Sequence, residues 1–450
     1  MEPVPKAKGP YGWGFAVKNT NRIMRMAAGC LVLAGVSGAP GQDWPQWRGA
    51  HRDAKAAGFT PPKTWPKELA LKWKIAVGSG DATPALAGDR IYVFTRQEGN
   101  EVISCLDAAN GQEVWSDKYA VPAIGGPDSA MHGGPRSSPT VAEVKAVTIG
   151  VRGQGNLPLW MWDPWTDVKV VTLGVCGTVS CLDAANGAVQ WRKNDFPGAW
   201  PRFHTATSPM VADGLCIVQL GKESQGAVVA YDLASGEQKW KWTDEGPGYA
   251  SPVLMTVAGT KMVVTLTAKS VAGLGLADGK LLWQAPFAPQ GMNYNAATPI
   301  IDGQTVFYCG SGRGTKAVKI EKEGDSFTAK ELWSNPDNAV QFDSPVLKSG
   351  LIFGLSQRGN FFCLNAQTGK TAWTDSTGGR GQFGSVVDAG SVLLGLTSKS
   401  TLVAFEPSDK EYTELASIKV ADKQTYAYPV LAGNRLFIKD QDSLTLWTID

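Results

Sequence analysis

Residues that could bind a ligand recur at one position in this sequence, three residues before a series of proline or proline-like positions. These residues are Asp81, Arg136, Ala206, Tyr249, Ala296, Phe342, Phe383 and Tyr426. Where the position holds Ala, the residues before it supply Arg202, Phe203 and His204, or Asn293, Tyr294 and Asn295. Aromatic walls with a few convergent polar groups suit a ligand pocket, and Arg suits carboxylates.

We therefore predict a ligand-binding site formed by Arg136, Arg202, His204, Tyr249, Asn293, Tyr294, Phe342, Phe383 and Tyr426. The alternative is that these rings only fill a central channel and the loops above it. No catalytic residues are predicted. The three His residues (His51, His132 and His204) have no zinc-site spacing, and no Ser lies in a Gly-x-Ser-x-Gly elbow. Gly310–Lys316 resembles a phosphate loop but lacks its Gly-Lys-Ser/Thr ending.

We predict that the cysteines are small core residues rather than partners in disulfides or metal ligands. Cys105, Cys181 and Cys363 occupy one equivalent strand position, where Ala230 also occurs. Equivalent positions in separate repeats are too far apart to bridge. Cys176, at an expected hairpin tip, is predicted to be a free thiol.

The elements that must position the site carry the repeated frame Asp-(x)3-Gly-(x)3-Trp. Asp starts a turn by accepting backbone N–H bonds, Gly supplies the positive φ, and Trp lies at a fixed depth on the next strand. The repeat residues are Asp107, Gly111, Trp115, Asp183, Gly187, Trp191, Asp232, Gly236, Trp240, Gly279, Trp283, Gly369 and Trp373. A hairpin unit of this kind cannot bury its own indole and needs a neighbouring unit.

A second marker counts the repeats. A hydroxyl residue precedes Pro at Thr83, Ser138, Ser208, Ser251, Thr298, Ser344 and Tyr428, and Ser385-Val386 fills the remaining place. Residues 83–450 number 368, or 46 for each of eight repeats, and propeller blades are about 40–50 residues long. We predict an all-β, eight-bladed β-propeller with four-stranded blades.

The ring is expected to close through its two ends. The segment 71–77 holds Trp73 but no turn precedes it, and the last repeat ends without a fourth strand. We predict that the Trp73 strand completes the last blade, beside residues 444–449, because closure removes exposed sheet edges.

The predicted domains are a polar preamble plus export signal at 1–39, an extended N-terminal arm at 40–70 and the propeller at 71–450. Arg22 and Arg25, an apolar run and small residues make the signal, which is too short to span a bilayer. A lipoprotein anchor at Cys30 is the less favoured interpretation, because most of the apolar run follows the Cys. The arm is expected to be pinned to the propeller surface by its indoles, or to form a lid over one face.

An insertion interrupts the second repeat at about 143–167. It is aromatic and loop-like, and it contains Trp160, Trp162 and Trp165. Such an insert either packs over the propeller or contacts a partner, so these three residues are candidates for partner binding. The formal charge of +2 gives no indication of nucleic acid. No later segment is apolar enough to cross a membrane, and we expect a monomer.

The frame resembles the tryptophan-docking repeat of the pyrroloquinoline quinone (PQQ) β-propeller superfamily over residues 43–450, nearest to exported barrel-assembly lipoproteins. This resemblance implies a periplasmic or secreted, non-catalytic scaffold that binds an envelope protein or a small ligand without a cofactor or metal. Quinoprotein dehydrogenases of the superfamily share an adjacent Cys-Cys disulfide and calcium ligands. This sequence has no Cys-Cys pair. A PQQ- and calcium-dependent oxidoreductase acting on alcohols or sugars is the alternative, and a glycan-binding propeller is a third possibility.

Overall fold

The computed structural model describes residues 43–125, 132–144, 168–291 and 294–450. The chain divides into two units, Met1–Ser37 and Gly38–Asp450, and every described residue belongs to the second. The predicted export signal, most of the blade-two insertion with Trp160, Trp162 and Trp165, and Asn293 therefore lie outside the described residues.

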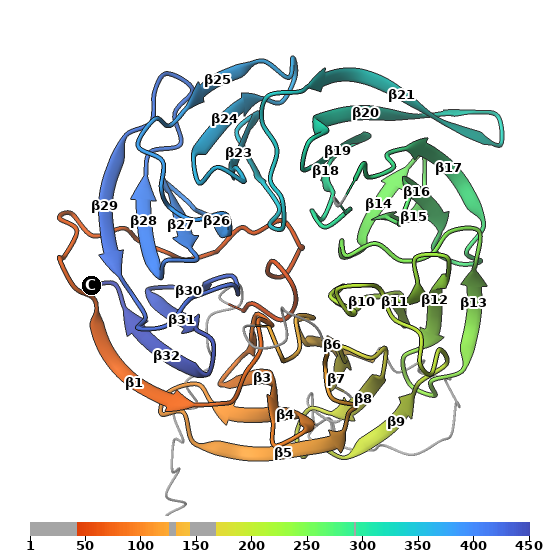
Figure 1. Cartoon of the computed structure of the whole chain (residues 1–450), viewed down its shortest axis with the longest axis horizontal. Helices are drawn as coiled ribbons and strands as arrows, with labels where there is room; N and C mark the ends of the chain where they lie inside the picture. The colour runs from red at the N-terminus through yellow and green to blue at the C-terminus, as the bar shows by residue number, and fades with distance from the viewer. Residues whose placement is uncertain (1–42, 126–131, 145–167, 292–293) are drawn as a thin grey trace, which may run out of the picture. The chain divides into compact units, whose positions relative to one another are not determined.

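Eight four-stranded antiparallel sheets form a ring, which confirms the predicted eight-bladed propeller (Figure 1). Blades 1 to 4 are β2–β5 (Ala85–Ala87, Arg90–Gln97, Asn100–Asp107, Glu113–Ala120), β6–β9 (Thr140–Glu143, Val168–Leu173, Val179–Asp183, Val189–Lys193), β10–β13 (Met210–Ala212, Leu215–Lys222, Gln225–Asp232, Gln238–Trp242) and β14–β17 (Val253–Val257, Thr260–Leu266, Ser270–Gly275, Leu281–Pro286). Blades 5 to 8 are β18–β21 (Ile300–Asp302, Thr305–Gly310, Gly314–Glu323, Ser326–Asn335), β22–β25 (Val346–Lys348, Leu351–Leu355, Phe361–Asn365, Thr371–Thr374), β26–β29 (Gly384–Ala389, Val392–Thr397, Thr401–Phe405, Glu414–Lys419) and β30–β32 (Val430–Ala432, Arg435–Lys439, Ser443–Thr448) with β1 (Ala70–Ala76).

The two ends of the chain close the ring as predicted. Strand β1 pairs antiparallel with β32, with Trp73 opposite Leu446 and Ile75 opposite Leu444. Because the last blade takes its outer strand from the N-terminal side, the ring cannot open without breaking a sheet.

Most of the repeated indoles dock on the next blade. The Nε1 groups of Trp115, Trp191 and Trp240 donate to the carbonyl oxygens of Ala184, Leu233 and Leu276, at 3.0, 2.9 and 2.9 Å. Each ring lies on the turn glycine of that blade. A Cβ added to Gly187 would lie 2.5 Å from Trp115, and Gly187 has a φ of 75°. The frame glycine therefore provides both a turn and a flat seat for the indole.

Trp283 is an exception because blade 5 has no Asp-x-x-x-Gly turn to receive it. Its Nε1 donates instead to Met262 Sδ of its own blade, at 3.0 Å. The hairpin of β20 and β21 is long, ten residues in each strand, and packs Phe327 and Ala329 against the core cluster that contains Trp283. The hairpin thus takes the place of the missing docking turn.

Blade 7 has lost its docking Trp, and the residue at that place is Ala416, next to Leu415. Ala416 pairs with Ala404, as Trp373 pairs with Cys363 in blade 6, while Leu415 is 37% exposed. A β-bulge at Phe405 sets this register. Trp447 of blade 8 packs against the same core cluster as Ala416 and donates to the Val420 carbonyl at 3.0 Å.

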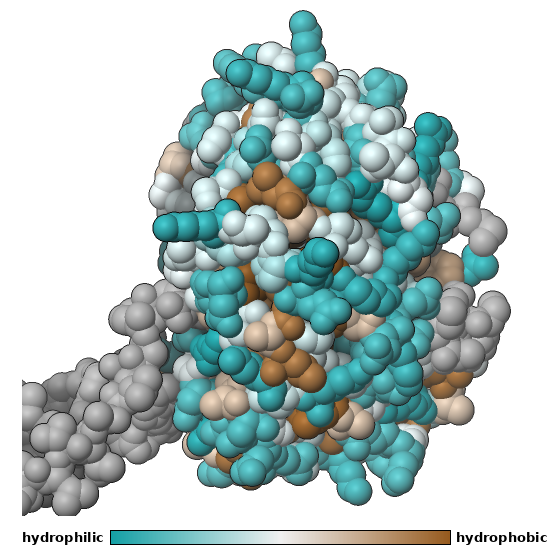
Figure 2. All heavy atoms as spheres, turned by 90° about the vertical axis from the view of Figure 1, so that its left-hand side faces the viewer, coloured by the Kyte–Doolittle hydropathy of each residue, from teal (hydrophilic) through white to brown (hydrophobic). Residues whose placement is uncertain are grey.

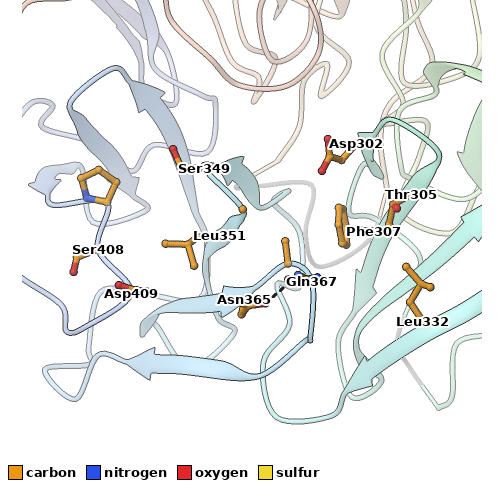
Figure 3. A pocket seen from close by; sticks show the side chains of 13 residues that line it. Asp302, Thr305, Phe307, Leu332, Ser349, Leu351, Asn365, Gln367, Ser408 and Asp409 are labelled. Carbon is orange, nitrogen blue, oxygen red and sulfur yellow. Dashed lines mark hydrogen bonds between the residues drawn. The ribbon is translucent and has the colours of Figure 1, made fainter.

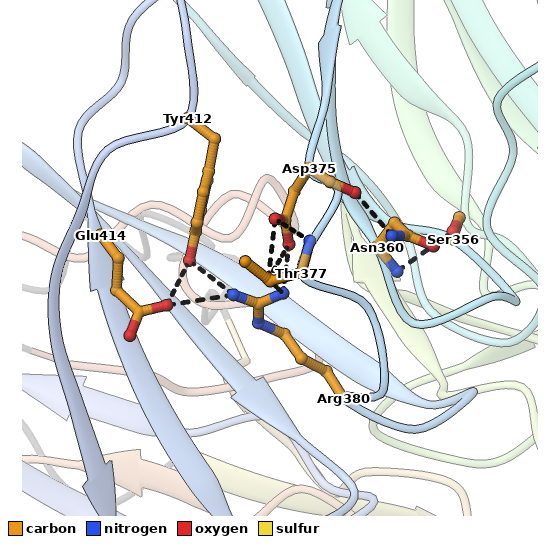
Figure 4. A network of polar contacts seen from close by, with 7 residues as sticks. All are labelled: Ser356, Asn360, Asp375, Thr377, Arg380, Tyr412 and Glu414. Atoms are coloured by element: carbon orange, nitrogen blue, oxygen red, sulfur yellow. Dashed lines mark hydrogen bonds and ion pairs between the residues drawn. The ribbon is translucent and has the colours of Figure 1, made fainter.

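A partly buried arginine also joins blades 6 and 7 (Figure 4). The Arg380 guanidinium lies near the rings of Phe361 and Tyr412, 5.0 and 5.2 Å from their centroids. It forms ion pairs with Asp375 and with Glu414, the second at 3.0 Å. Because Asp375 is buried, this cation neutralises a carboxylate that would otherwise be costly to bury.

The residues of the Ser/Thr-Pro marker form a belt of hydrogen bonds around the channel, open between Thr83 and Ser138, whose hydroxyl has no partner. In each case the backbone N–H of one blade donates to the marker hydroxyl of another: Ser138 to Ser208, Ser208 to Ser251, Ser251 to Thr298, Thr298 to Ser344, Ser344 to Tyr428, and Tyr428 to Thr83, at 2.8–3.3 Å. Blade 7 is bypassed, because the longer Tyr428 side chain reaches directly from blade 8 to blade 6. We call these residues the hydroxyl belt.

Residues 43–56 of the N-terminal arm enter the central channel, instead of lying on the propeller surface or covering a face, whereas Trp65 of the same arm packs against the core of blades 7 and 8. Residues 43–56, which we call the inserted loop, pair with Leu86 through Trp44 and bond to Asp388 through Ala56. Trp44 is 1% exposed. Between these points the loop contacts blades 2, 3, 5, 6 and 8 through the partners described below. In Figure 1 the arm runs from the rim into the centre of the ring.

The cysteines 105, 176, 181, 216, 309 and 363 are all buried and unbridged. Cys105, Cys181 and Cys363 each pair across the sheet with a docking Trp, where only a small side chain fits beside the indole. Burial raises the pKa of Cys181 to about 12. Cys176 is 4% exposed, so this thiol lies inside the protein. These are packing residues rather than reactive thiols.

The rim of the ring beside β29 and β1 is mainly hydrophilic. Figure 2 shows hydrophobic residues there in small separate groups. Leu71 of β1 and Leu415 of β29 are 54% and 37% exposed. Scattered exposed apolar side chains of this kind are normal on a soluble surface and do not indicate an interface on this side.

Candidate functional site

One cavity of about 300 Å³ lies at the mouth of the central channel, and we call it the cup. All eight residues that stand three positions before the proline-like positions line it, together with Trp47, His132, Phe203, Ser251, Tyr294 and Asp343. The eight blades place these residues around one axis because each enters the ring with the same strand. The cup is large enough for a small ligand or one large side chain of a partner.

Seven rings form a continuous arc around the cup, which we call the ring collar. Its members, in order around the mouth, are Phe203, Tyr249, Tyr294, Phe342, Phe383, Tyr426 and His132, with successive centroids 4.1–6.2 Å apart. Phe342 and Phe383 are stacked, with their planes 9° apart. The rings support one another, so the collar is a preorganised apolar surface.

Arg136 joins the two ends of the collar. Its Nη1 donates to the carbonyl oxygen of Phe203, and its Nη2 donates to that of His132 at 3.3 Å. The guanidinium therefore holds two loops from blades 2 and 3 while also lining the cup. A planar cation with five donors can do both.

An Asp–His pair supplies the other polar side of the cup. Asp81 Oδ2 lies 2.7 Å from His132 Nδ1, and the two side chains are 12% and 15% exposed. His132 also meets the Tyr426 ring edge to face, at 4.6 Å. The carboxylate orients the imidazole and leaves Nε2 as its remaining polar atom.

The floor of the cup belongs to the inserted loop. Trp47 packs edge to face on Tyr428 at 4.8 Å and donates from Nε1 to Thr298 Oγ1 at 3.0 Å. Beside it, Asp343 Oδ2 accepts a hydrogen bond from the Gly384 backbone N–H at 2.6 Å. Burial raises the pKa of Asp343 to about 7, although Gly384 and Arg48 favour its charged form. The cup is thus closed below.

Six of the nine predicted ligand-site residues line the cup: Arg136, Tyr249, Tyr294, Phe342, Phe383 and Tyr426. Arg202 lines a smaller neighbouring hollow of about 120 Å³ and packs over Phe203 at 5.3 Å. His204 lines neither hollow. It has a φ of 63°, and burial followed by Arg136 and Arg96 lowers its pKa. Asn293 is outside the described residues.

Four cup residues had no predicted role in the site: Trp47, His132, Ser251 and Asp343. The prediction took one residue from each blade, at a fixed distance before the proline-like position. It therefore missed His132, which lies four residues before Arg136, and Asp343, which follows Phe342. The neighbouring residues of each marker could have identified these two. Trp47 carried no such signal, because it reaches the cup through the course of the arm.

A second hollow, of about 790 Å³, lies between blades 5, 6 and 7 (Figure 3). Its polar side chains include Asp302, Asn365 and Asp409, and its apolar ones include Phe307 and Leu332. Figure 3 shows these side chains spread over the hollow rather than directed at one point. Specific ligand sites need convergent polar groups, so the cup is the better candidate.

Within the described ranges, no group of three or more His, Cys, Asp or Glu side chains is arranged to hold a metal ion. The acidic residues that line the cup are Asp81 and Asp343, and its lining contains no cysteine. The geometry accordingly favours binding of a group with a ring or an apolar face.

Comparisons with known proteins agree with this fold. A family model described as outer membrane protein assembly factor BamB matches residues 160–375. BamB of Burkholderia pseudomallei is 26% identical over 384 residues, which cover 82% of this chain and 85% of that protein. This chain is a PQQ-like repeat β-propeller related to BamB.

Enzymes are also among the proteins that resemble this chain. The quinohemoprotein alcohol dehydrogenase of Comamonas testosteroni is 27% identical over 183 residues, which cover 39% of this chain and 22% of that enzyme. Among solved structures, BamB from Moraxella catarrhalis superimposes with a TM-score of 0.58 at 14% identity, over 84% of this chain and 97% of that one. Such structural likeness shows the propeller fold alone.

In the part of the chain that the structure describes, no helix is long and apolar enough to cross a membrane.

Proposed function

We propose that this protein is an exported, non-catalytic propeller that binds a ligand in the cup at its channel mouth. The observation that carries the proposal is the ring collar, closed by Arg136 and floored by Trp47. The ligand is a segment of an envelope protein or a small molecule that presents a ring or an apolar face. Such a group stacks on the collar, while Asp81, His132 and Arg136 receive its polar atoms.

Export and a periplasmic or secreted location are part of this proposal. They are supported by the charged and apolar pattern of residues 22–39 and by the relation to an outer membrane assembly factor. An anchor at Cys30 remains the less favoured form. We expect a monomer that needs no metal or cofactor for binding. The expected partner class does not include nucleic acid.

The test is binding of defined probes to the purified propeller. Isothermal titration with methyl glycosides and with N-acetyl aromatic amino-acid amides covers both kinds of ring. Tyr249→Ala and Arg136→Ala should each weaken binding of the responding probe about tenfold or more, because a good stacking or charge-assisted contact contributes about 1–2 kcal/mol. Phe327→Ala, on the distant β20–β21 hairpin, is the control and should bind normally. Equal affinity in wild type and all three variants would show that the cup is not the binding site.

The blade-two insertion is a second candidate contact, for a protein partner. Trp160, Trp162 and Trp165 provide three large apolar rings within six residues, and such rings dominate protein interfaces. A Trp160→Ala/Trp162→Ala double variant should lose a partner that wild type retains from envelope extract. Recovery of the same partner in equal amounts by both forms would remove the insertion from the proposal.

The alternative is a PQQ-dependent oxidoreductase acting on alcohols or sugars, which the similarity to alcohol and methanol dehydrogenases supports. Calcium accompanies the quinone in that alternative. The collar offers stacking surfaces, but Trp47 and Arg48 of the inserted loop occupy the channel below it. The described residues provide no cluster for calcium. The described residues therefore fit a bound quinone and calcium ion poorly.

Reconstitution separates the two functions. Incubation with PQQ and Ca²⁺, followed by removal of free quinone, should leave no bound quinone spectrum and no alcohol- or sugar-dependent dye reduction. A bound quinone together with substrate-driven dye reduction would show that the protein is an oxidoreductase and not a non-catalytic scaffold.

A further inference from the structure

Two arginines are buried at the tip of the inserted loop, inside the channel. Arg48 is 0% exposed and Arg52 is 5% exposed. Backbone oxygens from different blades approach them: Arg48 Nη2 donates to Pro345, and Arg52 donates to Ser208 and Pro209. Both residues therefore carry positive charge to the centre of the ring.

The hydrogen bonds of Arg48 are incomplete. Its Nε and Nη1 atoms are buried and have no hydrogen-bond partner in the structure, and the same is true of Arg52 Nε. Lys439 shows how this fold otherwise treats a buried cation, because its ammonium donates to the carbonyl oxygens of Gly78, Gly80 and Asp440. A guanidinium with unsatisfied buried N–H groups is costly unless something else accepts them.

The counter-charge is also incomplete. Among the described residues, neither Arg48 nor Arg52 forms an ion pair with a carboxylate. Asp343 is close enough to interact electrostatically with Arg48, but its hydrogen bond goes to Gly384. One carboxylate at a distance cannot neutralise two cations, and burial followed by the charge of Arg48 lowers the pKa of Arg52 to about 9.

The backbone that presents these side chains is unusual. Arg48, Arg52 and Ala54 have φ values of 61°, 58° and 59°, in the left-handed region that non-glycine residues rarely adopt. Strained residues of this kind cluster at ligand clamps when the surrounding contacts hold them in place. Here they turn two arginines inward within one short loop.

We propose that the inserted loop holds a small inorganic anion, of the chloride or phosphate class, at Arg48 and Arg52 in the central channel. The anion accepts the unsatisfied N–H groups and supplies the counter-charge. It thereby fixes the loop in the ring and keeps Trp47 as the floor of the cup. The site is separate from the cup ligand, and it does not depend on the proposed function.

The experiment measures thermal stability against anion concentration at constant ionic strength, with gluconate as the bulky replacement. The melting temperature of wild type should rise by about 1–2 °C for each tenfold increase in chloride or phosphate above the dissociation constant. Separate chloride and phosphate titrations identify the anion. Arg48→Gln should abolish the response, whereas Arg358→Gln, at an exposed arginine of blade 6, should retain it.

Two further measurements keep the proposal falsifiable if Arg48→Gln does not fold. Asp343→Asn removes the nearby negative charge and should leave the anion response intact or increase it; loss of the response would place the anion elsewhere. Crystals grown in bromide should show an anomalous peak beside Arg48. Water alone at that position, or a wild-type melting temperature independent of both anions, would overturn the site.

Discussion

At the scale of single residues, the hydroxyl before each proline has a role that the sequence marker did not reveal. Ser251, for example, accepts a hydrogen bond from the Ser208 backbone and donates its own N–H to Thr298. Proline at the next position has no N–H and so needs no partner there. In six blades the marker thus combines an inter-blade hydrogen bond with a strand start, whereas the Ser138 hydroxyl of blade 2 is buried without a partner.

The first prediction concerns this belt. Ser251→Ala should lower the free energy of unfolding by about 1–3 kcal/mol, because it leaves the buried Ser208 N–H without an acceptor. Ser137→Ala is the matched control. The Ser137 hydroxyl is buried but has no hydrogen-bond partner, so its loss should change stability much less. Urea unfolding of both variants measures the loss in free energy of unfolding. Equal losses in the two variants would show that the hydroxyl belt does not stabilise the fold.

The second prediction concerns pH. Burial raises the pKa of Asp343 from 3.8 to about 7, with Arg48 and the Gly384 N–H acting in the opposite direction. The folded protein therefore favours the neutral acid. Its contribution to stability is fully present below pH 3.8 and is lost as pH rises toward 7. Asp343→Asn, which stays neutral, should match wild type near pH 4 and exceed it at pH 8.

Chemical unfolding at both pH values, at one fixed chloride concentration, measures this difference. The Asn side-chain oxygen can still accept the Gly384 hydrogen bond, so the variant changes charge more than geometry. A stability difference that does not depend on pH would show that Asp343 titrates normally.

At the scale of elements, the docking turn and the indole of the previous blade act as one unit. The turn glycine must have positive φ and must also leave room for the ring. Where the turn is missing, as in blade 5, a longer hairpin covers Trp283 instead. Where the Trp is missing, as in blade 7, Trp447 comes from the neighbouring blade. The contact between blades is therefore kept even where the frame is not.

The third prediction separates the two demands on the glycine. Gly187→Ala and Gly259→Ala replace glycines with φ values of 75° and 77°. An added Cβ would meet the Trp115 ring at Gly187 and open space at Gly259. Both variants should lose about 1 kcal/mol from backbone strain. Gly187→Ala should lose about 1–3 kcal/mol more because the indole must move. Thermal unfolding measures both, and equal losses would mean that docking contributes nothing.

At the scale of the whole molecule, the inserted loop turns a ring with a channel into a ring with a closed cup. The loop contacts blades 1, 2, 3, 5, 6, 7 and 8 through Leu86, Val141, Pro209, Thr298, Pro345, Asp388 and Tyr428. It thus ties distant blades together from the inside, while β1 closes the ring from the outside.

The fourth prediction tests this central anchor. Trp44→Ala should lower the free energy of unfolding by about 3–5 kcal/mol, as for other fully buried indoles, because Trp44 is 1% exposed beneath the ring. Leu254→Ala, at a side chain that is 40% exposed, is the control and should cost little. A small effect of Trp44→Ala would show that the loop contributes little to the fold.

The sequence alone determined the repeat count, the blade pattern and the closing strand. Each of these rests on local turn chemistry that is repeated at a regular interval. Trp115 marks the regular blade pattern, and Trp73 marks the strand that closes the ring. The same periodicity placed residues such as Tyr249 and Phe383 at one depth in eight blades, so six of the predicted residues line the cup.

Only the tertiary structure decided the course of the arm and the floor of the cup. Residues 43–56 have no repeat to fix their place, and their path depends on contacts with distant residues, up to 381 positions away for Trp47 and Tyr428. Such long-range contacts leave no local pattern. For the same physical reason, two arginines that the sequence presents as ordinary polar residues lie buried together at the centre of the molecule.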